Sequence, residues 1–202
     1  PDELLMIFAR DVISRHPGAD IVFDIKSTRR LNNLISSYGG RPVMWKTGHS
    51  HMYNKILECS APLGGEFSGH IFFHDRWHGF DDGIYAAARL VEIITIREQG
   101  LDEIVASFES RQATPEIKVD IAEEKKFSVM EQLISNHTFQ DGKVTTIDGL
   151  RVDFPKAWGL IRASNTSPAL TLRFEAESEE ALEKIQSLFR QQLLTIDSTL
   201  TF

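Results

Sequence analysis

The sequence has little of what would place a protein in an oxidising compartment, in a membrane or on nucleic acid. Cys59 is the only cysteine in 202 residues, so an internal disulfide is excluded, and we expect a reducing, cytoplasmic location. No apolar run approaches the roughly 18 residues that a membrane span needs. The formal net charge of −7 gives no overall positive field for nucleic acid or anionic lipid. We therefore expect neither as a partner, and an anionic ligand must meet local cations.

The residue pattern changes near residue 110, and this change predicts two domains, 1–110 and 111–202. In the first, short apolar runs such as Ile21–Phe23 and Val43–Trp45 alternate with segments of helical periodicity, which is typical of α/β domains. In the second, strand-like segments are separated by turn residues, and helices are predicted near Phe127–Ser135 and at the C-terminal end. That order is typical of a smaller α+β domain.

The loop Gly65–His70 concentrates groups that suit a polyol. The carboxylate of Glu66 can accept hydrogen bonds from two vicinal hydroxyls, and the flanking glycines let the backbone approach a ligand closely. If the segment is extended, Ser68 and His70 lie on the same face as Glu66. Composition alone also allows an ordinary polar turn before a strand at Ile71–Phe73.

The loop Arg162–Pro168 suits a phosphate. A guanidinium, hydroxyls and a carboxamide surround backbone N–H groups in this segment, and together they match the several acceptor oxygens of a phosphate. The candidate contacts are Arg162, Ser164, Asn165 and Thr166. The alternatives are a surface arginine in an ion pair and a plain turn, which the same residue types also favour.

Lys26 and His49 each follow a predicted strand. The crevice outside the carboxyl ends of strands is the usual ligand site of open α/β sheets, so both side chains are candidates for a functional site. His49 precedes a helix expected around His51–Glu58, and an ordinary imidazole pKa of about 6.5 suits proton exchange at neutral pH. The alternatives are a hydrogen-bonded turn histidine and a solvated lysine.

A second histidine pattern points towards metal binding but fails on geometry. His70, His74 and His78 recur every four residues, which is a ligand spacing on a helix. Because residues 70–78 are predicted as a strand and a turn, these side chains would not share a face. No cysteine or carboxylate cluster completes a site, so we expect no metal site within this chain.

Five segments of the chain, in their order and spacing, resemble the α-D-phosphohexomutases, specifically the phosphomannomutase/phosphoglucomutase branch. They are Asp24–Arg30, Lys46–Ser50, Gly65–His70, Phe80–Ile84 and Arg162–Glu175. Asn165 favours this branch over the phosphoglucosamine mutases, whose loop typically carries glycine followed by threonine and glutamate. The resemblance implies a mixed-sheet α/β domain, the family's third, followed by a smaller C-terminal α+β domain with an antiparallel sheet and helices.

The resemblance also implies a function for a longer parent protein. Full-length members have four domains, and the loops that carry the reactive phosphoserine and bind Mg²⁺ precede the part matched here, so we expect this chain to be a C-terminal piece that begins at Pro1. The parent would be an isomerase, an intramolecular phosphotransferase that interconverts hexose 1-phosphates and hexose 6-phosphates of mannose or glucose through a glucose 1,6-bisphosphate-type intermediate. The piece alone would be inactive.

The implied roles divide the candidate residues between chemistry and binding. His49 is a candidate general acid/base, and Lys26 is a ligand-facing cation that neutralises phosphate or a developing oxyanion. Glu66, Ser68 and His70 would bind sugar hydroxyls, and Arg162, Ser164, Asn165 and Thr166 would bind the phosphate that is not transferred. A phosphoglucosamine mutase piece and a non-catalytic module that binds sugar phosphates remain alternatives.

Overall fold

The computed structural model describes residues 1–202, which divide into two units, Pro1–Glu109 and Ser110–Phe202. No helix in it combines the length and apolar character that crossing a bilayer requires. The strands of the first unit are β1 (Asp20–Asp24), β2 (Arg41–Trp45), β3 (Leu63–Gly65) and β4 (Ile71–Phe73). Its helices are α1 (Asp2–Arg15), α2 (Arg30–Ser37), α3 (His49–Cys59), α4 (Gly83–Arg97) and α5 (Leu101–Ala106).

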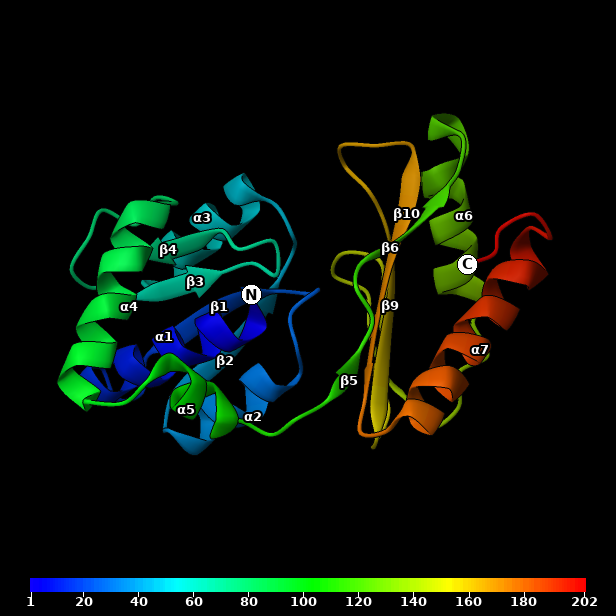
Figure 1. The fold of residues 1–202 in the computed structure, drawn as a ribbon. Coiled ribbons are helices and arrows are strands. Elements are labelled where there is room, and N and C mark those ends of the chain that lie inside the picture. Colours follow the sequence, from blue (N-terminus) through cyan, green and yellow to red (C-terminus); the bar gives the residue numbers. More distant parts are fainter. The chain divides into compact units, whose positions relative to one another are not determined.

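The sheet of the first unit is mixed and buried on both faces. Its order is β2-β1-β3-β4, with β1 parallel to β2 and β3, and β3 antiparallel to β4 (Figure 1). Along β1, Ile21 and Phe23 join the core that α1 covers, whereas Val22 joins a second core with Met52 and Ile56 of α3. Because successive side chains of a strand point to opposite faces, the apolar centre of this strand, Ile21–Phe23, needs a helix on each side.

Two helix starts position loops in this unit. The expected helix around His51–Glu58 begins earlier, at His49, because Gly48 has a φ of 127° and its carbonyl accepts from the backbone N–H of Met52. Helix α4 begins after Asp82, whose side chain accepts from the N–H groups of residues 84 and 85. Asp82 is therefore the N-cap of this helix, where its negative charge is also favourable.

The second unit is an antiparallel sheet with helices, as predicted, and the structure places the helices on one face. Its order is β5-β10-β9-β8-β7, and β6 also pairs with β10. Helices α6 and α7 lie on the same side of the sheet in Figure 1, where they pack against β9 and β10. The elements are β5 (Gln112–Ala113), β6 (Ile117–Asp120), α6 (Glu123–Asn136), β7 (Lys143–Thr145), β8 (Leu150–Asp153), β9 (Ala157–Ala163), β10 (Ala169–Ala176) and α7 (Glu179–Ile196).

Candidate functional site

The loops that follow β1, β2 and β3 meet at the buried carboxylate of Asp24. Its Oδ1 accepts from the hydroxyl of Ser27 at 2.6 Å and from the backbone N–H of Phe67 at 3.0 Å. Its Oδ2 accepts from the hydroxyl of Thr47 at 3.0 Å. Parallel neighbours end at the same sheet edge, so one carboxylate can hold all three loops there. The sequence analysis quoted Asp24 within a motif without giving it this role.

Glu66 is a buried carboxylate at this edge, only 3% exposed. The backbone N–H of Gly48 donates to its Oε1 at 2.5 Å, while Oε2 makes no hydrogen bond within the protein. Burial raises the pKa of Glu66, as does the charge of Asp24, whereas the Gly48 hydrogen bond and the charges of His70 and Lys26 lower it. A partly desolvated carboxylate with one acceptor oxygen left over can receive ligand hydroxyls.

The segment from Glu66 to His70 is a turn, so the extended backbone that would have placed Ser68 and His70 on the face of Glu66 is not present. The N–H of Glu66 donates to the carbonyl of His70, and the N–H of Gly69 donates to the carbonyl of Glu66, both at 2.9 Å. The chain must reverse here because β3 and β4 are antiparallel neighbours, and Gly69 permits this with a φ of 97°. Glu66 is thereby buried, whereas Ser68 and His70 are exposed.

His70 has a carboxylate partner. Its Nδ1 lies 2.6 Å from Oδ2 of Asp81, and Oδ1 of Asp81 accepts from the backbone N–H of Ile71 at 3.1 Å. Such a pair fixes the ring orientation and leaves Nε2 as the outward-facing nitrogen. The sequence analysis placed Asp81 in a matched segment but did not assign it to His70, because the pair depends on how β4 meets the start of α4.

The two other candidates at this edge differ in their surroundings. His49, the first residue of α3, is exposed, and its ring centre lies 5.2 Å from that of Phe72. No side-chain hydrogen bond orients it. Lys26 is 8% exposed, with its ammonium 5.9 Å from the ring centre of Phe67. The acid/base role of His49 and the cationic role of Lys26 stay predictions.

In the second unit the candidate loop connects β9 to β10, and Ser164 organises it. The hydroxyl oxygen of Ser164 accepts from the N–H groups of Thr166 and Ser167, at 3.3 and 3.2 Å, and from the hydroxyl of Ser167 at 2.8 Å. Ser164 is buried, whereas Asn165 and Thr166 are exposed at the tip. The predicted ligand contact at Ser164 is thus also an internal brace, a common arrangement for serine in turns.

Arg162 is oriented by a carboxylate from a neighbouring turn. Its Nε and Nη2 donate to the two carboxylate oxygens of Asp148, at 3.1 and 3.5 Å. Nη1 makes no hydrogen bond within the protein, so the outer edge of the fork remains free to bind an anion. Gly149, which follows Asp148 in the chain, has a φ of 97°. A Cβ at this position would lie 2.6 Å from Cβ of Arg162. The ion pair considered as an alternative exists, and it holds the guanidinium in place.

Lys126 of α6 contacts the β9–β10 loop, and it was not among the residues predicted from the sequence. It is 1% exposed, and its ammonium donates to the carbonyl of Ser164 at 2.7 Å and to that of Ser167 at 3.3 Å. The ammonium also pairs with Glu123 at 2.6 Å. Helix α6 begins earlier than the helix predicted near Phe127–Ser135, and so it includes Lys126. The available signal was the spacing of Lys126 from Val129, Met130 and Leu133, which places it on the apolar side of the helix, where a buried lysine needs partners.

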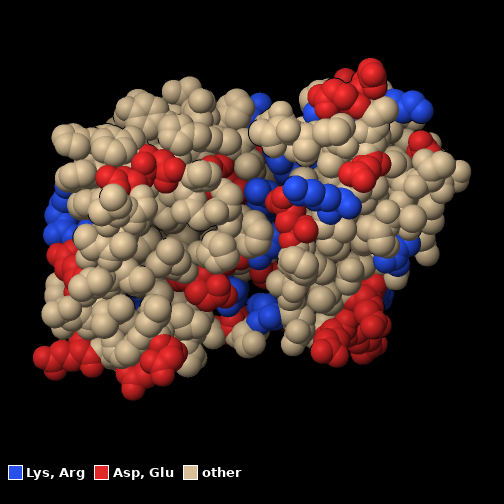
Figure 2. Space-filling model, turned by 45° about the horizontal axis from the view of Figure 1, so that its top comes forward, with Lys and Arg blue, Asp and Glu red and all other residues tan.

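The charges around both loops are local. No group of three or more His, Cys, Asp or Glu side chains in residues 1–202 could hold a metal ion. Acidic and basic side chains are interspersed with wide uncharged areas on the face of each unit in Figure 2. The cations next to the candidate loops are individual side chains, namely Lys26, Arg162 and Lys126.

Comparisons with known proteins agree with the two-unit architecture. Residues 1–111 match a family model described as phosphoglucomutase/phosphomannomutase, alpha/beta/alpha domain III, and residues 116–192 match the C-terminal domain of the same family. A phosphomannomutase/phosphoglucomutase of Pseudomonas aeruginosa is 56% identical over 99% of this chain and 43% of its own length. A phosphoglucomutase of Neisseria gonorrhoeae is 45% identical over 94% of this chain and 42% of its own length.

One similar solved structure covers the residues of both units. The crystal structure of a phosphoglucomutase/phosphomannomutase family protein from Burkholderia thailandensis aligns with a TM-score of 0.92 and 44% identity. The alignment covers 100% of this chain and 43% of that protein. The chain therefore spans less than half the length of the relatives it matches.

Proposed function

The chain belongs to the phosphoglucomutase/phosphomannomutase family, and we propose that the full-length protein interconverts hexose 1-phosphates and hexose 6-phosphates of glucose and mannose. The observation that carries the proposal is the pair of preorganised loops, one presenting the Glu66 carboxylate and the other the Arg162 fork. These groups match the two chemical features of a hexose phosphate, its hydroxyls and its phosphate. The names of the relatives favour glucose and mannose over glucosamine.

In the proposed reaction a phosphoserine of the full-length protein gives its phosphoryl group to the free hydroxyl end of the sugar phosphate. The resulting bisphosphate then reorients in the site, and its other phosphoryl group is transferred to the serine oxygen. Mg²⁺ would assist at the transferred group, and both the serine and the metal ligands would come from outside residues 1–202. This chain would supply positioning and proton transfer, and we infer a cytoplasmic enzyme.

Each loop has a distinct task in this proposal. The buried Glu66 would accept from hydroxyls that look alike in both orientations of the bisphosphate, with Ser68 and His70 beside it. Arg162 and the tip of its loop, Asn165 and Thr166 with Ser164 behind them, would bind the phosphate that stays on the sugar. Lys26 would balance the negative charge of the ligand near Glu66.

The candidate proton carriers at this edge are His49 and His70. His49 is the residue that the resemblance favours, whereas His70 has the orienting carboxylate. The full-length His49→Asn and His70→Asn variants separate them, because loss of proton transfer lowers kcat more than it raises KM. A variant with unchanged kcat across neutral pH excludes that histidine as the proton carrier.

The central experiment measures phosphoryl transfer by the full-length protein on glucose, mannose and glucosamine 1-phosphates. Turnover of the first two supports the proposal, preference for glucosamine 1-phosphate supports the phosphoglucosamine mutase alternative, and binding without turnover supports a non-catalytic module. Residues 1–202 alone are expected to bind hexose 1-phosphate weakly and to give no turnover.

The matched test of the phosphate loop is Arg162→Lys, which keeps the charge but loses the planar fork. Affinity for hexose 1-phosphate should fall roughly tenfold or more, which corresponds to losing one charged hydrogen bond, while affinity for the free hexose should not change. Equal losses for both ligands would mean that the loop has only a structural role.

A further inference from the structure

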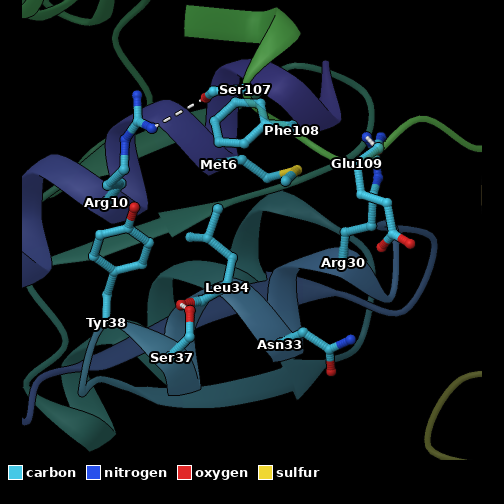
Figure 3. Close-up of a pocket in the computed structure, with 10 residues that line it drawn as sticks. All are labelled: Met6, Arg10, Arg30, Asn33, Leu34, Ser37, Tyr38, Ser107, Phe108 and Glu109. Atoms are coloured by element: carbon cyan, nitrogen blue, oxygen red, sulfur yellow. Dashed lines mark hydrogen bonds between the residues drawn. The ribbon is translucent and has the colours of Figure 1, made fainter.

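A cavity in the first unit is lined by none of the candidate site residues, and Arg30 is the one lining residue that it shares with the matched segments. It has a volume of about 360 Å³ and lies among α1, α2 and the residues that follow α5 (Figure 3). Met6, Leu34 and Phe108 give it an apolar wall, and the exposed side chains of Asn33 and Tyr38 border it. The proposed mutase reaction uses none of these residues.

Arg10 lines this cavity as a buried cation without a counterion. It is 8% exposed, and its one hydrogen bond, from Nη1 to the hydroxyl of Ser107, is long at 3.3 Å. Its guanidinium carbon lies 5.1 Å from the ring centre of Phe108. Nε has no partner, Nη2 makes no hydrogen bond, and no carboxylate pairs with the group. Burying a guanidinium in this state is unfavourable unless another group binds to it.

The other arginine of the cavity, Arg30, donates a hydrogen bond from each of its three guanidinium nitrogens, and its charge is paired with Glu3. Arg30 donates from Nη2 to Glu3 at 2.6 Å, from Nη1 to the carbonyl of Glu109 at 2.8 Å and from Nε to the hydroxyl of Thr28 at 3.2 Å. Glu109 also lines the cavity, but it makes no ion pair with Arg10. Arg10 is therefore the one cation of the lining without a counterion, and it lies next to the apolar wall. One such charge balances a monoanion and leaves a phosphate dianion in excess.

We propose that this cavity binds a small monocarboxylate that carries an apolar or aromatic group. The carboxylate accepts from the Nη1 and Nη2 end of Arg10, because Nε is shielded from solvent. The apolar group packs against the wall that Met6, Leu34 and the half-buried Phe108 form.

The test titrates residues 1–202 with 3-phenylpropionate and follows backbone amide shifts. We expect shifts at Tyr38 and at residues 107–109. The neutral analogue 3-phenylpropanamide has the same apolar group without the charge, and it should bind about tenfold more weakly or worse, since a hydrogen bond to a charged group is lost. Inorganic phosphate should bind more weakly than the carboxylate.

Two variants assign the charge to one residue. Arg10→Met should weaken 3-phenylpropionate about tenfold or more and, in the absence of ligand, should unfold at a temperature no lower than the wild type. Arg41→Met, which removes an arginine that is 67% exposed in its side chain, should bind the carboxylate as the wild type does. Three outcomes would overturn the proposal: equal binding of acid and amide, unchanged binding by Arg10→Met, or shifts confined to Gly65–His70. Tighter binding of phosphate, or a lower unfolding temperature for Arg10→Met, would also contradict it.

Discussion

The structure predicts that Lys126 holds the candidate phosphate loop in shape from the outside. Its ammonium binds the carbonyls of Ser164 and Ser167, at the two ends of the loop's tip. Lys126→Met keeps the length and the apolar stem of the side chain while removing all three N–H donors. The loop should then lose its anchor on α6, although its internal brace at Ser164 remains.

The expected cost follows from the geometry. The 2.7 Å hydrogen bond from a charged donor to Ser164 contributes about 1.5–3 kcal/mol, and the 3.3 Å bond to Ser167 adds less. The pair with Glu123 adds about 0–1 kcal/mol, because that glutamate side chain is 59% exposed. Burying methionine is easier than burying a charge, which offsets part of the loss. We expect a net loss of about 2–3 kcal/mol, or a roughly 30- to 150-fold increase in loop opening.

Amide hydrogen exchange measures this directly, because it reports the loop separately from the strands around it. Exchange at Thr166 and Ser167 should accelerate in Lys126→Met, and hexose 1-phosphate should bind more weakly. Lys125→Met is the matched control, since Lys125 is the neighbouring residue of the same helix and is exposed. Equal exchange rates in the two variants would refute the reasoning, as would an unchanged rate in Lys126→Met.

Three further predictions concern buried groups of the two units. Glu66→Gln keeps the acceptor for Gly48 but removes a carboxylate whose pKa is raised by burial, so the wild type should lose stability relative to this variant as the pH rises above the ordinary value of 4.5; urea unfolding at acid and neutral pH tests the sign. Gly149→Ala brings a Cβ within 2.4 Å of the carbonyl oxygen of residue 161. It should lower the free energy of unfolding by roughly 1–3 kcal/mol more than Gly39→Ala does, because Gly39 also has a positive φ, of 83°, but has open space around it. Equal losses in the two variants would exclude the contact as the cause. Asp24→Ala should destabilise the first unit by roughly 2–4 kcal/mol and Asp24→Asn by much less; similar values for both would contradict its role as an acceptor.

Hydrophobic periodicity in the sequence predicted many of the helices and strands, but it did not predict the shortest ones. The alternation of strands and helices and the change of pattern near residue 110 are local signals, and the mixed and antiparallel sheets follow from the family resemblance. Strand β3 was not predicted, because Gly64 and Gly65 have low strand propensity. They are there because a Cβ at Gly64 would lie 2.4 Å from Ile56 and one at Gly65 would lie 2.6 Å from Leu5. Only the packed helices on both faces explain that choice.

The sequence by itself determined which residue types occupy the two candidate loops, because Glu66 lies in a short polar segment between two strands and Arg162 lies near the end of β9, next to another such segment. The tertiary structure decided how they are held. Asp24 joins loops that are 43 residues apart, Lys126 reaches a carbonyl 38 residues away, and Asp148 meets Arg162 across 14 residues. Such contacts depend on sheet order and strand register, and a local pattern specifies neither. For the same reason the turn at Gly69, which separates Ser68 from the face of Glu66, follows from the antiparallel pairing of β3 and β4.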